Sequence, residues 1–173
     1  MDMGTDAIRN YLTLLQSVLG DITAGTEIQE TEDGPVLLCT VQSPFNSEEE
    51  IGYRFEITPI GDGMIVIETM MILFTGIGAD KTAGLNRLAA EINNRLSLGS
   101  LRILDAEGSV TVMYSNGSVF DEELDAGTVT KLLGRNVGIM ETAAVNAGDY
   151  IYRYLNGEDV EALIADIGSE EEE

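Results

Sequence analysis

Residues Thr75–Thr82 resemble a phosphate-binding loop. They form a glycine-rich stretch between an apolar segment and a predicted helix, and the stretch ends in Lys81-Thr82. A phosphate loop, G-x-x-x-x-G-K-[ST], needs its glycines so that backbone N–H groups can surround the anion. Aligned on Lys81, the glycine positions hold Thr75 and Asp80, and Asp80 would set a carboxylate beside the anion. The stretch therefore favours a strand-to-helix turn with Asp80 as the helix cap, and phosphate binding is the alternative.

Two runs of carboxylates form the second candidate site. Residues Glu48–Glu50 and Asp121–Glu123 offer the oxygen ligands that hard cations prefer. Neither run has the spacing of a cation-binding loop, and Asp105–Gly108 lacks most of the EF-hand pattern and suits a hairpin turn. Acidic clusters of this kind are typical of solvated surface. We therefore predict no metal and no cofactor, with a cation at an acidic cluster as the alternative.

Nucleophilic catalysis lacks its usual residues in this sequence. The chain contains no histidine, which removes the commonest general base and the Ser/His and Cys/His pairs. Its one cysteine, Cys39, lies in an apolar segment and has no second cysteine to pair with, which predicts a buried thiol in a reducing compartment. An enzyme using Asp/Glu pairs would have only the abundance of carboxylates in its favour. The sequence therefore predicts a non-enzymatic protein with no catalytic residues.

Length and charge restrict the architecture and the partners. The 173 residues predict a single domain over residues 1–168, followed by an acidic disordered tail over residues 169–173. Nine Lys+Arg against 31 Asp+Glu give a formal net charge of −22, which opposes binding to nucleic acid or to an anionic membrane. The first residues carry carboxylates where a signal peptide needs positive charge, and the most apolar window is too short to span a bilayer. We expect a cytoplasmic protein.

Hydrophobic periodicity predicts the elements that position these residues. Apolar residues recur at spacings of three and four in the helical segments and at a spacing of two in the strands. The predicted elements are a helix between Thr5 or Asp6 and Gly20, a meander of three or four strands from Glu27 to about Ile72, a helix from Asp80 to Gly99, a hairpin over Leu101–Tyr114, a long helix from Asp125 to Asn156-Gly157, and a short last helix before Gly168. The order α-β-β-β(-β)-α-β-β-α(-α) favours an α+β fold, a mostly antiparallel sheet with packed helices.

The long helix contains glycines that call for a close neighbour. A glycine inside a helix costs roughly 1 kcal/mol relative to alanine, so Gly134 and Gly138, four residues apart, predict close approach by another backbone or a kink. That neighbour is either this chain's own sheet or a second subunit or ligand. The thioether of Met140 and the phenols of Tyr150 and Tyr154 suit a core or an interface equally. These five residues are the candidate interaction surface.

One segment of the chain resembles a known family. The Asn-rich helix over Leu85–Leu96 precedes a short strand at Leu101–Leu104, an acidic-Gly turn at Asp105–Gly108, an apolar strand at Val110–Tyr114 and a long helix. This order is similar to that of the YbjN family, whose members are associated with bacterial sensory transduction. The whole element order resembles the type III secretion chaperone-like fold. The resemblance brings no catalytic residue to this chain.

The resemblance implies a cytoplasmic protein, often a dimer, that binds other proteins and performs no chemistry. We therefore expect a protein-interaction module, a YbjN-like regulator or a chaperone-like binder of another protein, that forms a homodimer and binds neither nucleic acid nor membrane. The alternative is a small-ligand or cation-binding domain that uses the Gly76–Thr82 turn or an acidic cluster.

Overall fold

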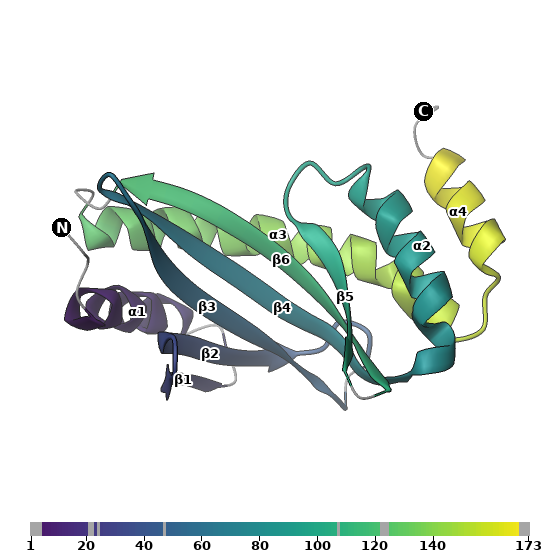
Figure 1. Cartoon of the computed structure of the whole chain (residues 1–173), viewed down its shortest axis with the longest axis horizontal. Helices are drawn as coiled ribbons and strands as arrows, with labels where there is room; N and C mark the ends of the chain where they lie inside the picture. The colour runs from purple at the N-terminus through teal and green to yellow at the C-terminus, as the bar shows by residue number, and fades with distance from the viewer. Residues whose placement is uncertain are drawn as a thin grey trace.

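One six-stranded antiparallel sheet and four α-helices make up the described part of the protein (Figure 1). The computed structural model describes residues 5–20, 23, 25–46, 48–106, 108–121 and 125–169. In chain order the elements are α1 (Thr5–Leu19), β1 (Gly25–Thr31), β2 (Gly34–Gln42), β3 (Glu50–Gly61), β4 (Met64–Gly78), the 3₁₀ turn η1 (Ala79–Lys81), α2 (Thr82–Asn93), β5 (Ser100–Ala106), β6 (Ser109–Asp121), α3 (Ala126–Leu155) and α4 (Val160–Ser169). The predicted α+β class and element order are confirmed, with four strands in the meander.

The sheet has one face in the core and one face that no described helix covers. Its strand order is β1-β2-β3-β4-β6-β5, and buried and less buried residues alternate along β3 and β4. The buried set includes Phe55, Ile67 and Met71, which share one hydrophobic core with buried residues of α1, α2 and α3. In Figure 1 the sheet lies in front of the long helix α3, while α2 and α4 pack together at one end of the molecule. Among the described elements, none covers the opposite face of the sheet, which we call the outer sheet face.

The termini of α3 follow the sequence prediction. Asp125 is the N-cap residue, and its Oδ1 accepts a hydrogen bond from the Thr128 backbone N–H at 3.1 Å. The next residues past the other end include Gly157, with a φ of +99° that suits a helix terminus. Hydrogen bonds from the Thr128 hydroxyl and then from its N–H hold the pKa of Asp125 below its usual value.

We expect Asp125→Ala to lower the melting temperature at pH 7 but not at low pH. A carboxyl whose pKa is depressed by folding stabilises the fold above its unfolded pKa of about 4 and loses that effect as the pH falls towards its folded pKa. The two melting curves should therefore converge below about pH 4. Asp149→Ala, at an exposed site within the same helix, is the control. A melting difference between Asp125→Ala and wild type that persists unchanged at low pH would contradict this explanation.

Three local predictions were wrong. Asp80 lies inside η1 and is not the cap of α2, whose N-cap residue is Lys81. Helix α2 ends at Asn93 rather than at Gly99, and the residues between Asn93 and Ser100 form a loop that leads to β5. The hairpin does not stop at Tyr114, since β6 continues to Asp121.

Of the predicted tail over residues 169–173, Ser169 ends α4 and the other four residues lie outside the described part. Within the described residues, no helix combines the length and the apolarity that crossing a bilayer requires.

Candidate functional site

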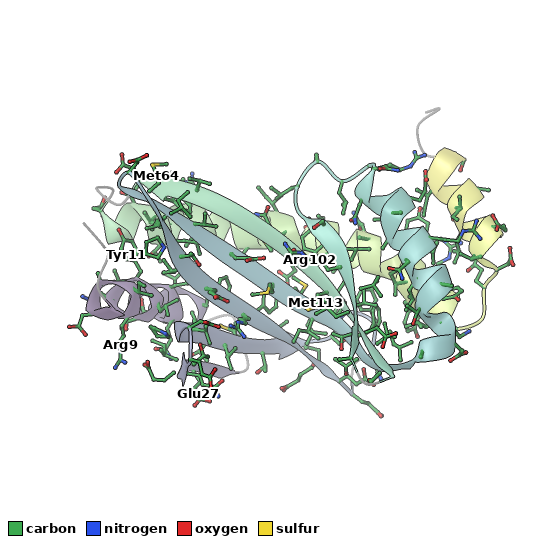
Figure 2. The ribbon with its side chains drawn as sticks, viewed as in Figure 1. Arg9, Tyr11, Glu27, Met64, Arg102 and Met113 are labelled. Atoms are coloured by element: carbon green, nitrogen blue, oxygen red, sulfur yellow. The ribbon has the colours of Figure 1, made fainter. Side chains whose placement is uncertain are left out.

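The outer sheet face is the first candidate site. It consists of the side chains that alternate with the core residues of β2 to β6, and its central members are Leu38, Arg54, Glu56, Val66, Glu68, Met70, Ile72, Arg102, Leu104, Met113 and Val119. Figure 2 shows Arg102 and Met113 near β5 and β6, and Glu27 at the opposite, β1 edge of the sheet. Val119 is 56% exposed and Leu104 is 49% exposed, whereas Met70 and Met113 are half-buried. This face therefore presents apolar side chains to solvent.

Four charged side chains cross the centre of the outer sheet face. Glu56 and Glu68 stand directly opposite each other on β3 and β4, an arrangement that destabilises a sheet unless the charges are neutralised. Each has an arginine: Arg54 Nη2 lies 3.0 Å from Glu56 Oε2, and Arg102 Nη2 reaches from β5 to within 3.3 Å of Glu68 Oε1. The charges of these four residues sum to zero, in a chain whose formal net charge is −22.

A cavity of about 240 Å³ between the sheet and helices α1 and α3 is the second candidate site. Its apolar walls come from α1, β2, β3 and α3, and its polar groups are a hydroxyl, a thiol, a phenol and a carboxylate. The lining residues are Leu19, Thr23, Cys39, Val41, Tyr53, Phe55, Val137 and Glu141.

The thiol and the phenol of this cavity are protonated donors rather than nucleophiles. Cys39 is 2% exposed, and burial raises the pKa of its thiol to about 11. Burial, and then the charge of Glu141, raises the pKa of Tyr53 above its ordinary value. Because a thiolate, not a thiol, is the reactive form of cysteine, Cys39 is poorly suited to nucleophilic attack at neutral pH. The arrangement can donate hydrogen bonds to a guest.

The structure does not gather the five predicted interaction residues into one surface. A Cβ at Gly134 would lie 3.5 Å from Val18 Cγ1, so the neighbour at this glycine is α1 of the same chain and not the sheet. Gly138 is exposed, and a Cβ there would contact no described residue. Met140 is 1% exposed and belongs to the core. A partner contact at Gly138 stays a prediction, while Met140 faces inward in this structure.

The two tyrosines lie near the other end of α3, where they contact arginine and lysine. The Arg153 guanidinium lies 5.4 Å from the centre of the Tyr150 ring, and Lys81 Nζ lies 5.1 Å from the centre of the Tyr154 ring. The Tyr154 hydroxyl occupies the place that a Cβ at Gly84 of α2 would need. Tyr154 therefore packs α3 against η1 and α2. Lys81, the lysine of the suspected phosphate loop, contributes to this contact.

The acidic clusters offer no arrangement of ligands where they are described. Glu48–Glu50 are exposed, and Glu122 and Glu123 lie outside the described residues. Within the described ranges, no group of three or more Cys, Asp or Glu side chains is placed to hold a metal ion.

Sequence reasoning missed both the charged centre of the outer sheet face and the cavity. A signal for the former was present, since Arg54, Glu56 and Glu68 interrupt apolar strands with a period of two. Their pairing depends on the strand register, which periodicity alone does not supply. Tyr53 and Glu141 come together only through the packing of α3 on β3.

Comparison with known proteins does not assign this chain to a family. No protein-family model matches the sequence, and no curated protein matches it significantly.

Proposed function

We propose that this chain is a non-enzymatic protein-interaction module that pairs with a second copy of itself through the outer sheet face. The observation that carries the proposal is that the four charges at the centre of this face sum to zero, on a chain of net charge −22. Two copies repel each other over acidic surface, and that repulsion is weakest where the charges sum to zero. The exposed apolar side chains of Val119 and Leu104 supply surface that association would bury.

The arrangement of the charges favours a second copy as the occupant. Each glutamate of the central pair has one arginine on the outer sheet face: Arg54 lies two residues from Glu56 on β3, and Arg102 lies on β5, across β6 from Glu68. Because the patch carries both signs, a second copy that faces it pairs its arginines with these glutamates. Symmetric pairing of one patch with itself is also the commonest form of association among soluble oligomers.

The resemblance to the YbjN family and to chaperone-like proteins supports an interaction role of this kind. On this proposal the dimer acts as a regulator or as a binder of another protein, in the cytoplasm. The buried, unpaired Cys39 supports a reducing compartment. The protonated thiol and phenol of the cavity support a role without nucleophilic chemistry. The alternative, a ligand or cation at the Gly76–Thr82 turn, gains no support from the contact between Lys81 and Tyr154.

Association is tested by sedimentation and light scattering over a range of protein concentrations. We expect wild type to be a dimer and Val119→Glu to weaken the dimer at least about tenfold, because it places unpaired charges in the interface. Ile139→Glu is the matched control: Ile139 is 58% exposed against 56% for Val119, but it lies on α3, and the substitution adds the same charge.

Two outcomes would overturn the proposal. One is a wild-type protein that stays monomeric at every concentration. That result would overturn self-association even if a different protein binds the outer sheet face. The other is a dimer that Ile139→Glu disrupts and Val119→Glu leaves intact, since that result would place the interface on the helices.

A further inference from the structure

The cavity beneath β2 and β3 has the size of a site for a small molecule. An engineered apolar cavity of roughly 150 Å³ binds benzene, so a cavity of about 240 Å³ has room for about ten non-hydrogen atoms. Its walls of Leu19, Val41, Phe55 and Val137 are apolar. Glu141 is the lining residue on α3 that is exposed to solvent, which indicates the side from which a guest enters.

A buried hydroxyl without a partner indicates what the guest must carry. Tyr53 is 4% exposed, and within the described part of the chain its hydroxyl forms no hydrogen bond of normal geometry; the Glu141 carboxylate lies near it and interacts with it strongly enough to help raise its pKa. A buried polar group left in this state destabilises the fold, and such groups are rare in native structures. A guest with an oxygen acceptor would supply the missing partner.

Charge restricts the guest further. The Glu141 carboxylate lies close enough to Tyr53 to raise the pKa of the phenol, and the chain as a whole is strongly acidic. A carboxylate or phosphate guest would be repelled by both. A hydroxyl group, by contrast, can accept from Tyr53 and donate to Glu141 at the same time.

We propose that this cavity binds an uncharged, largely apolar molecule of about ten non-hydrogen atoms whose single hydroxyl lies between Tyr53 and Glu141. The apolar body packs against Phe55 and the aliphatic walls. The cavity lies on the core side of the sheet, so this binding is independent of the association proposed for the outer sheet face.

The test uses 4-propylphenol as the probe, with propylbenzene and 4-propylbenzoate as analogues that lack the hydroxyl or carry a negative charge. Binding to the full chain is followed by calorimetry and by the rate at which a small thiol reagent modifies Cys39. Cys39 is the only cysteine in the sequence and lines the cavity, so its protection reports occupancy of this site. We expect 4-propylphenol to bind about tenfold more tightly than propylbenzene, to slow modification of Cys39, and to bind more tightly than 4-propylbenzoate.

Tyr53→Phe provides the decisive variant, because it removes only the hydroxyl and retains the ring. We expect it to weaken 4-propylphenol about tenfold while leaving the affinity for propylbenzene unchanged. Tyr152→Phe, at a tyrosine of α3 that is 39% exposed and does not line the cavity, is the control and should change neither affinity. The proposal is overturned by 4-propylphenol that leaves the Cys39 rate unchanged, or by equal affinities of wild type and Tyr53→Phe for 4-propylphenol.

Discussion

Asn93→Ala is expected to lower the free energy of unfolding by about 2–3 kcal/mol, because Asn93 satisfies the free edge of the sheet. β5 is an edge strand, and its Leu101 is 3% exposed. Asn93 Nδ2 donates to the Leu101 carbonyl oxygen at 2.9 Å, and the Leu101 N–H donates to Asn93 Oδ1 at 2.7 Å. Alanine would leave both backbone groups without these partners.

The neighbouring asparagine provides the control for this prediction. Asn94 is exposed at the end of α2, and Asn94→Ala should change the free energy of unfolding by no more than about 0.5 kcal/mol. Asn93→Asp retains the acceptor for the Leu101 N–H and loses the donor. Its loss in the free energy of unfolding should therefore lie between those of Asn94→Ala and Asn93→Ala. Urea unfolding with unchanged m-values measures all three. Equal midpoints for Asn93→Ala and Asn94→Ala would show that the pair of hydrogen bonds does not hold β5.

The sequence allowed prediction of those elements whose signal is local. Periodicity and turn residues located the meander, the hairpin of β5 and β6 and the long helix, because each depends on neighbouring residues, although Asp105 and Ala106 of the predicted turn belong to β5. The length of β6 was missed because Ser115 and Asn116 are polar, yet both are buried in the structure. The adjacent asparagines Asn93 and Asn94 were noticed only as part of a resemblance, since their different roles depend on where β5 lies.

The candidate sites depend on contacts between segments that are distant in sequence. The neutral centre of the outer sheet face depends on the position of Arg102 of β5 beside Glu68 of β4, which follows from the strand order and not from either segment. The unpartnered Tyr53 hydroxyl likewise becomes visible only when α3 is packed on the sheet. Composition excluded reactions that need histidine, but it could not indicate the outer sheet face or the cavity as candidate sites.

Gly99→Ala is expected to be the most damaging of the substitutions considered, with a loss of about 3–4 kcal/mol in the free energy of unfolding. Gly99 has a φ of +69°, a conformation that costs an alanine roughly 1–2 kcal/mol. A Cβ there would also lie 2.7 Å from the Ser115 carbonyl oxygen and 2.7 Å from Cε1 of the Tyr114 ring. That ring is held by a hydrogen bond from its hydroxyl to the Leu98 carbonyl oxygen, so it cannot simply turn away.

Gly108→Ala separates the two causes. Gly108 also has a positive φ, of +82°, but a Cβ there would contact no described residue. The loss in the free energy of unfolding of Gly108→Ala should therefore be limited to the conformational cost of roughly 1–2 kcal/mol. For a chain of this size, 1 kcal/mol corresponds to about 2–4 °C in melting temperature, so Gly99→Ala should melt several degrees below Gly108→Ala. Equal melting temperatures would mean that backbone conformation alone constrains Gly99 and that the loop after α2 does not pack closely on β6. A lower value for Gly99→Ala would instead show that this close approach fixes the position of Ser115, which stands between Met70 and Ser100 on the outer sheet face.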